Sequence, residues 1–216
     1  QEIRDYQRRL HGELESRRTS FIEHVEAEKP GIISRGETSG ENRKQRTGSL
    51  DRSTDDTKSG TVDELLLKAL YAHNNEEFHR AIELYDIIMQ KEIAPSIRAM
   101  IYVHRGMAFF SAARYEAALD NFLESAKLEP GNSKVFYYQG IVYRVLDKPA
   151  KALEAFQRSL DIDPYNFESL FALAQAYFKA GDAPAALEYC NKALSLAPEN
   201  KRIADFRSHV STSMKL

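Results

Sequence analysis

The chain has 216 residues, of which 43% are hydrophobic, and its formal net charge is −2. This length suits one or two domains with a real hydrophobic core, and the near-neutral charge excludes the basic excess typical of nucleic-acid-binding proteins. No apolar run is long enough to span a membrane. The single cysteine, Cys190, excludes an internal disulfide and a multi-cysteine metal site. Because such cysteine usage is typical of a reducing compartment, we predict a cytoplasmic protein.

Residues 1–29 are predicted to form one amphipathic helix. Its apolar side chains recur mostly at steps of three, four or seven, as they do along one helical face. They are Ile3, Tyr6, Leu10, Leu14, Phe21 and Val25. Because a lone helix with such a stripe must bury it somewhere, we expect one of two partners. The stripe either docks into a groove of its own chain or forms a coiled-coil homodimer through residues 1–29.

Residues 30–61 are predicted to form a flexible linker. The segment is polar and has no aromatic residue, so it cannot bury enough surface to offset the entropy of ordering. Two short stretches, 46–50 and 53–56, resemble kinase sites, but such matches are common by chance and we favour a plain linker. Thr61 and Glu64 have the spacing of a capping box, which predicts that a helix begins directly after Thr61.

From this point the sequence repeats itself, with a period of 34 residues and one interval of 37 between the first and second units. The small and aromatic residues of the first helices are Gly106, Gly140 and Ala174, with Phe109, Tyr143 and Tyr177. Those of the second helices are Ala81, Ala118, Ala152 and Ala186, with Tyr85, Phe122, Phe156 and Cys190. The prolines that follow are Pro130, Pro164 and Pro198. Small residues allow helices to approach closely, aromatic residues fill the spaces between hairpins, and the prolines stop each second helix.

These positions resemble the tetratricopeptide repeat, whose pattern is a bulky residue, Leu-Gly, Tyr, Ala, Phe, Ala and Pro. The resemblance covers residues 62–199 and is weakest in the first unit, where Ala72 replaces the aromatic residue and three extra residues lengthen the exit. It implies an all-α, right-handed superhelical array of four helix hairpins. The predicted units are 62–98, 99–132, 133–166 and 167–199. Residues 200–216 are predicted to be a capping helix and tail, because repeat arrays need a polar end cap.

No catalytic constellation is visible, so we predict a protein that is not an enzyme and that has no catalytic, metal or cofactor site. There is no Gly-rich phosphate loop and no paired His-Glu metal motif. His73 and His79 are six residues apart and would face different sides of a helix, which favours structural or surface roles. Cys190 takes an aromatic core position, so it is interpreted as a small buried hydrophobic residue.

The resemblance also implies that the first helix of each repeat lines a concave partner-binding groove. The residues on that face are Leu66, Leu70, Val103, Met107, Phe110, Tyr137, Ile141, Arg144, Phe171, Gln175, Phe178 and Lys179. Chaperone-binding members of the family hold a peptide carboxylate with Lys, Asn and Arg. At those places this chain has Leu66, Leu70, Val103, Lys134 and Tyr138, and since only the Lys is retained, a carboxylate clamp is disfavoured. Part of the stripe could instead pack between adjacent repeats.

We therefore predict a scaffold or adaptor that binds an apolar or amphipathic segment of a protein or peptide partner, with no nucleic acid and no membrane span. That segment could come from the chain's own first helix. Two alternatives are a regulatory fragment of a larger signalling protein, in which residues 1–29 lead into the repeats as a coiled coil, and the non-catalytic part of an enzyme whose catalytic domain lies upstream. The start at Gln1 instead of Met indicates a fragment or a processed form.

Overall fold

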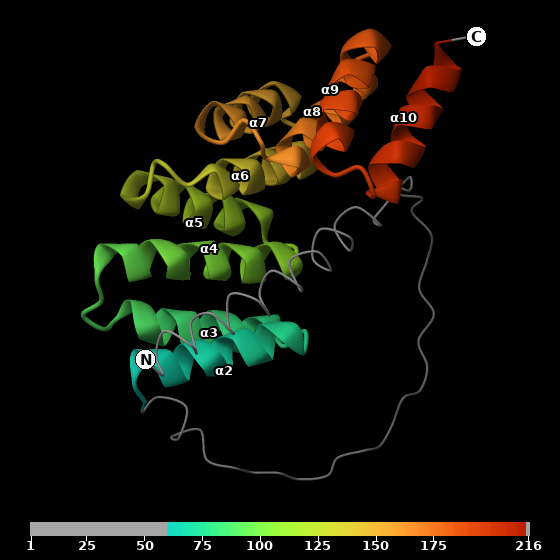
Figure 1. The fold of residues 1–216 in the computed structure, drawn as a ribbon. Coiled ribbons are helices and arrows are strands. Elements are labelled where there is room, and N and C mark those ends of the chain that lie inside the picture. The colour runs from blue at the N-terminus through green and yellow to red at the C-terminus, as the bar shows by residue number, and fades with distance from the viewer. Residues whose placement is uncertain (1–59, 215–216) are drawn as a thin grey trace, which may run out of the picture. The chain divides into compact units, whose positions relative to one another are not determined.

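The structure is a computed structural model that describes residues 60–214, and within this range it contains only α-helices. The helices, coloured along the chain in Figure 1, are α2 (Val62–Asn74), α3 (Phe78–Met89), α4 (Pro95–Ser111), α5 (Tyr115–Leu128), α6 (Ser133–Val145), α7 (Pro149–Ile162), α8 (Phe167–Lys179), α9 (Ala183–Leu196) and α10 (Lys201–Ser213). The predictions for residues 1–29, and for nearly all of the linker at 30–61, lie outside the described residues.

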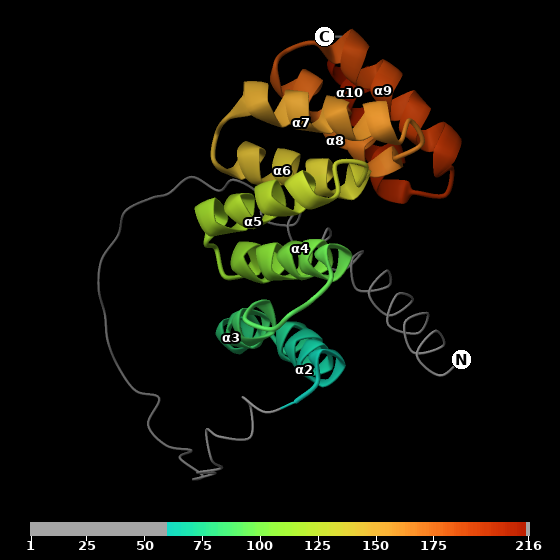
Figure 2. The same ribbon diagram turned by 90° about the vertical axis from the view of Figure 1, so that its left-hand side faces the viewer.

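The helices pack as four consecutive hairpins, α2 with α3, α4 with α5, α6 with α7 and α8 with α9. Each second helix also contacts the first helix of the next hairpin, and α10 packs on α9. Figure 2 shows the successive pairs stacked on one another from α2 to α10. The predicted all-α array of four hairpins is therefore confirmed, with a further helix at the predicted place of the cap.

The helix starts follow local sequence signals. Thr61 and Glu64 form the predicted capping box: the Thr61 hydroxyl accepts from the Glu64 backbone N–H at 3.3 Å, and the Glu64 carboxylate accepts from the Thr61 N–H at 3.1 Å. Asp182 caps α9 by accepting from the Ala185 N–H at 3.0 Å. Pro149 stands in the first turn of α7, where its missing N–H costs no hydrogen bond.

The three extra residues between the first and second repeats do not simply lengthen the connecting loop, as the sequence had suggested. Instead α4 has 17 residues, four more than the 13 of α2, α6 and α8, and α3 has 12 residues, two fewer than the 14 of α5, α7 and α9. Pro95 is the first residue of α4, because a proline fits the first helical turn even though it ends a preceding helix.

Every hairpin turns through one residue in the left-handed backbone region, at the same place in the repeat. These residues are Glu76, Ala113, Asp147 and Gly181, with φ of 63°, 57°, 52° and 87°. The N–H after each donates back to the first helix, for example from Arg114 to the Phe109 carbonyl at 2.8 Å. Only the fourth repeat has glycine, the residue that adopts this conformation without a steric penalty, so the other three turns are held by packing and these hydrogen bonds.

The core of each hairpin depends on close helix approach at the small residue of the first helix. A Cβ added to Gly140 would lie 2.4 Å from the ring of Phe156, and one added to Gly106 would lie 2.8 Å from the ring of Phe122. Both rings are buried. Because no Cβ fits at these distances, the two glycines are required by the aromatic residues opposite them.

The fourth repeat has Ala174 and Cys190 at the positions of this pair, and both are buried. Relative to Gly140 and Phe156 of the third repeat, the fourth repeat thus has an additional methyl group on the first helix and no large ring opposite it. We expect Cys190→Phe alone to destabilise the protein by about 1–3 kcal/mol through overpacking. The double variant Ala174→Gly with Cys190→Phe should recover most of that loss, which urea unfolding would measure. Equal destabilisation of the single and double variants would contradict this pairing.

Candidate peptide-binding groove

The structure places the twelve predicted groove residues in three classes of exposure. The buried ones are Leu66, Leu70, Phe110, Tyr137, Ile141 and Phe171. The half-buried ones are Val103, Met107, Arg144, Gln175 and Phe178, and Lys179 is exposed. The predicted groove residues that are not buried therefore lie on α4, α6 and α8.

A hydrogen bond joins two predicted groove residues from neighbouring repeats. The Arg144 guanidinium on α6 donates to the amide oxygen of Gln175 on α8 at 2.7 Å. Close by along the chain, Lys179 and Asp147 form a 3.9 Å ion pair between exposed side chains. Burial lowers the pKa of Arg144, with a smaller opposing effect from Tyr137, but guanidinium groups remain charged in proteins. A half-buried cation with one hydrogen bond to Gln175 has further N–H donors for the backbone carbonyls of a bound segment.

Phe171 and Phe178 contact the C-terminal helix, which the sequence did not predict. The ring of Phe206 on α10 lies edge-on to both, with centroids 5.5 Å apart in each case. The ring of Phe178 also meets His209 at 5.3 Å. These two predicted groove residues therefore help to hold α10, whose Ile203 and Val210 are buried.

The positions of a carboxylate clamp are largely apolar or packed. Leu66 and Leu70 are buried on α2. The Tyr138 ring stacks on Phe122, with centroids 5.3 Å apart. These contacts leave Lys134 as the basic residue among the five aligned positions.

Two histidines lie together near the α2–α3–α4 junction, which helical spacing did not reveal. The Nε2 atom of His73 lies 3.4 Å from the Ser111 hydroxyl. The ring of His104 stacks on Tyr85 with centroids 6.4 Å apart. The pKa of both histidines is lowered to about 4, chiefly by burial, with a smaller contribution at His104 from the neighbouring His73. Both rings are therefore neutral at pH 7 and belong to the packing.

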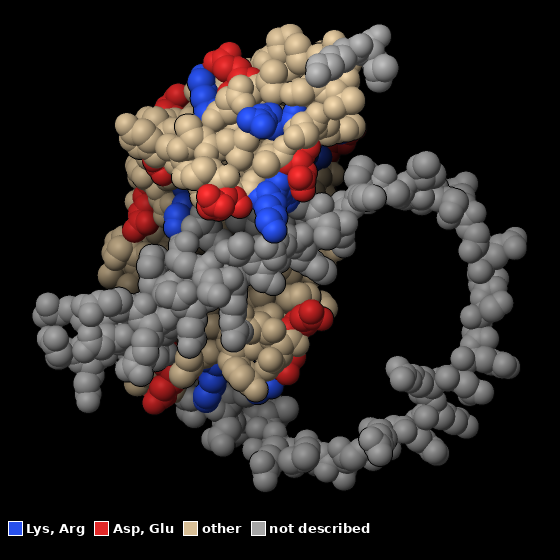
Figure 3. Space-filling view, turned by 45° about the vertical axis from the view of Figure 1, so that its right-hand side comes forward, with Lys and Arg blue, Asp and Glu red and all other residues tan. Residues whose placement is uncertain are grey.

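A metal site, a reactive cysteine and a membrane-spanning helix each have requirements that can be compared with the described residues. Within residues 60–214 no three His, Cys, Asp or Glu side chains are grouped so as to hold a metal ion. Cys190 is buried, and that burial raises its thiol pKa to about 11, so the thiolate nucleophile is scarce at neutral pH. None of the described helices is long and apolar enough to cross a membrane. On the face shown in Figure 3, Lys and Arg alternate with Asp and Glu across a mostly uncharged surface.

Two tetratricopeptide repeat family models match the sequence, one over residues 103–167 and the other over residues 146–210. Together they span half of the chain. The chain therefore belongs to the tetratricopeptide repeat proteins, whose fold is generally a protein-interaction module and usually non-catalytic. No curated protein sequence matches the chain.

Several solved structures share the fold. MamA superposes with a TM-score of 0.58 at 23% identity, covering 66% of this chain and 81% of that one. YrrB, described as a tetratricopeptide repeat protein with an unusual peptide-binding site, gives 0.56 at 19% identity and covers 74% and 80%. The first such domain of Spaghetti (RPAP3), bound to the HSP90 peptide SRMEEVD, gives 0.54 at 18% identity and covers 56% and 96%. At these identities the likeness concerns the fold.

Proposed function

We propose that the groove residues of α4, α6 and α8 bind an apolar or amphipathic segment of a partner protein, so that the chain acts as a scaffold or adaptor. The observation that carries this is the Arg144–Gln175 hydrogen bond, because it links a predicted groove residue of α6 to one of α8 in the next repeat. The peptide-bound state of one structural relative, and the peptide-binding site named for another, agree with this use of the fold.

The chemistry of this face selects the class of ligand. Val103 and Met107 are half-buried apolar side chains on α4, and the flexible thioether of Met107 adapts to different ligand surfaces. Arg144 and Gln175 add a few placed polar groups, which orient a bound segment without supplying most of the affinity. An amphipathic helix or an extended apolar stretch suits such a surface. A ligand held chiefly by its C-terminal carboxylate does not, because Leu66, Leu70 and Tyr138 stand where polar clamp residues would be needed.

Replacing Met107 with Glu is expected to weaken ligand binding by at least about tenfold, since a carboxylate would be buried without a partner in the complex. A display library of random 16-residue peptides, selected on the full-length chain, supplies the ligands. Apolar residues in the enriched peptides should recur at helical or alternating spacing. Fluorescence anisotropy with the best peptide then compares the variant with the wild type.

Leu123→Glu is the matched control, because Leu123 is an apolar residue of α5, a second helix, and 36% exposed. It should bind the selected peptide with unchanged affinity. Circular dichroism of both variants verifies the fold. If Met107→Glu and Leu123→Glu bind equally well, or if the enriched peptides share only a C-terminal acid, the proposed groove is wrong. Phe178→Glu is unsuitable for this test, because its ring packs against Phe206.

A further inference from the structure

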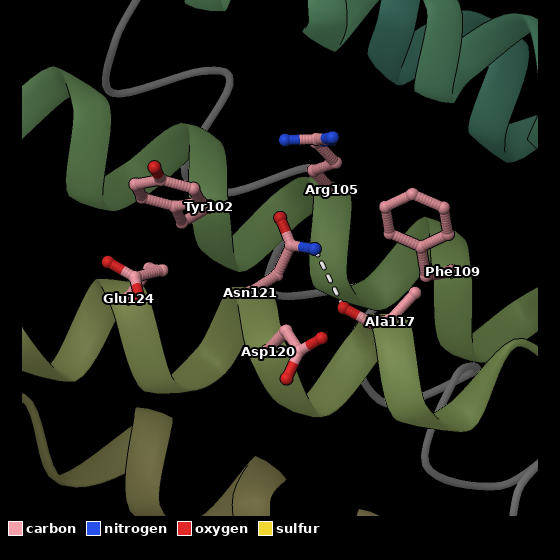
Figure 4. Close-up of a pocket in the computed structure, with 7 residues that line it drawn as sticks. All are labelled: Tyr102, Arg105, Phe109, Ala117, Asp120, Asn121 and Glu124. Carbon is pink, nitrogen blue, oxygen red and sulfur yellow. Dashed lines mark hydrogen bonds between the residues drawn. The ribbon is translucent and has the colours of Figure 1, made fainter.

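A hollow separate from the proposed groove lies between α4 and α5 of the second repeat. Its volume is about 300 Å³, and Figure 4 shows the seven side chains that line it. Tyr102, Arg105 and Phe109 come from α4, while Asp120, Asn121 and Glu124 come from α5. None of these residues is among the predicted groove residues, so the hollow is a separate feature of the same array.

The corresponding place is filled by the chain's own cations and aromatic rings in the next two repeats. In the third repeat the Arg158 guanidinium lies 4.4 Å from the Phe136 ring centroid, and the Lys151 ammonium lies 5.8 Å from that of Tyr143. In the fourth, Tyr189 stacks on Tyr177 at 5.3 Å.

One period before Arg158 and Lys151 the second repeat has Glu124 and Ala117. Two periods before Tyr189 it has Asn121, and the third repeat has Ala155 at that position. Beside the hollow, Glu124 and Ala117 thus stand where the third repeat has two cations, while the Phe109 ring that lines it is covered by the Arg114 guanidinium, 4.6 Å from the ring centroid. Tyr102 stands at the position of Phe136, and the cation near it is Lys127, which interacts electrostatically with Tyr102 while it pairs with Glu124.

Two buried polar atoms at the hollow have no hydrogen-bond partner among the described residues. The Asn121 side-chain oxygen is one, although its amide nitrogen donates to the Ala117 carbonyl at 2.7 Å. Asn121 is only 6% exposed, and in Figure 4 this oxygen points up toward Arg105. The other is the Nε atom of Arg105, whose terminal nitrogen pairs with Asp86 at 2.8 Å. A buried acceptor or donor without a hydrogen-bond partner destabilises the fold, unless a water molecule or a ligand supplies that hydrogen bond.

We propose that the hollow receives an arginine side chain from a partner protein segment, in the role that Arg158 plays within the third repeat. The guanidinium would stack on Tyr102 and donate to the Asn121 oxygen and to the Asp120 carboxylate. Arginine suits the site better than lysine, because its planar fork can stack on a ring while several N–H groups donate at once. The free Nε of Arg105 would donate to a backbone carbonyl of the same segment.

The surrounding charges agree with a cationic ligand. Asp120 and Glu124 flank the hollow, and Arg105 is already paired with Asp86. Lys127 pairs with Glu124 at 2.5 Å, but both side chains are exposed, at 69% and 45%. Such a surface pair contributes little and yields readily to a competing guanidinium.

The test is an NMR titration of the ¹⁵N-labelled full chain with the peptide acetyl-Gly-Gly-Arg-Gly-Gly-amide. The expected result is a saturable shift of α4 and α5 amide signals around Tyr102 and Asn121, with a dissociation constant in the millimolar range. The same peptide with citrulline, a neutral isostere of arginine, should bind at least tenfold more weakly. A water molecule alone in the hollow would give no saturable shift and would overturn the proposal.

The decisive variant is Glu124→Arg, which places in the second repeat the residue that the third repeat has as Arg158. It should fill the hollow and weaken peptide binding at least tenfold, while the melting temperature stays the same or rises. Glu154→Arg is the matched control, because it makes the same charge change on α7 and should leave binding unaltered. Equal losses in both variants would mean that the peptide senses only overall charge, which would also overturn the proposal.

This test is independent of the groove. Met107→Glu, which should weaken binding of the groove peptide, is expected to leave the arginine peptide's affinity unchanged. Conversely, Glu124→Arg should leave the groove peptide's affinity unchanged. If the proposal for the groove is wrong, the test of the hollow is unaffected, and the reverse also holds.

Discussion

Gly140→Leu is expected to distort or unfold the third repeat and to lower the melting temperature by about 5–10 °C, on the basis of an overpacking cost of about 1–3 kcal/mol or more. Even the first carbon of a new side chain would lie 2.4 Å from the Phe156 ring. That ring cannot move aside easily, because it is fully buried and lies 5.9 Å, centroid to centroid, from Tyr137. Thermal unfolding followed by circular dichroism measures the effect.

Alanine substitutions make the same prediction quantitative. Alanine is a better helix former than glycine by about 1 kcal/mol, so propensity alone predicts that Gly140→Ala and Gly106→Ala stabilise the protein. Packing predicts the opposite, with the greater loss at Gly140, because the clash at Gly106 is milder at 2.8 Å. Gly131→Ala is the control, since a Cβ there meets nothing within 4 Å. An unchanged melting temperature for Gly140→Leu would show that the helices of this hairpin do not approach as described.

Acidification from pH 6.5 to pH 4 is expected to destabilise the protein through His73 and His104. In the folded state burial holds both pKa values near 4, below the 6.5 of an ordinary histidine. Between these pH values the unfolded chain binds more protons than the folded one, so the free energy of unfolding falls as the pH falls. Above pH 6.5 both rings are neutral in either state, and below pH 4 their contribution levels off. The conversion of 1.36 kcal/mol per pKa unit gives about 3 kcal/mol for each ring as an upper limit, and because both side chains are only half-buried, the expected loss is smaller.

Urea unfolding at half-unit pH steps measures this loss, and histidine variants assign it. His73→Gln and His104→Gln should each flatten the pH dependence between 6.5 and 4. His79→Gln is the control, because His79 is exposed on α3 and should leave the profile unchanged. If His73→Gln and His104→Gln keep the full wild-type slope, carboxylates cause the acid sensitivity instead, and the two rings do not titrate as described.

Local chemistry and periodicity were sufficient to predict the fold class and several of its details. The recurrence of Gly106 and Gly140 at 34 residues indicated close helix approach, and the structure confirms a ring opposite each. Thr61 indicated a helix start, because its capping hydrogen bonds involve a residue only three positions away. Such signals are readable in sequence because each depends on neighbours within one turn or one repeat.

Other features were decided only when the hairpins packed together. The extension of α4 and the contact of Phe206 with Phe171 and Phe178 depend on where a following helix comes to lie. The partial burial of His73 and His104 depends on residues far apart in the chain, such as Ser111 beside His73. The hollow beside Asn121 is formed by side chains of both α4 and α5, so it depends on how these two helices pack. The 34-residue period by itself determined how the helices pair, whereas the surfaces on which a partner can act were set by tertiary packing, because exposure depends on every element that comes to cover a side chain.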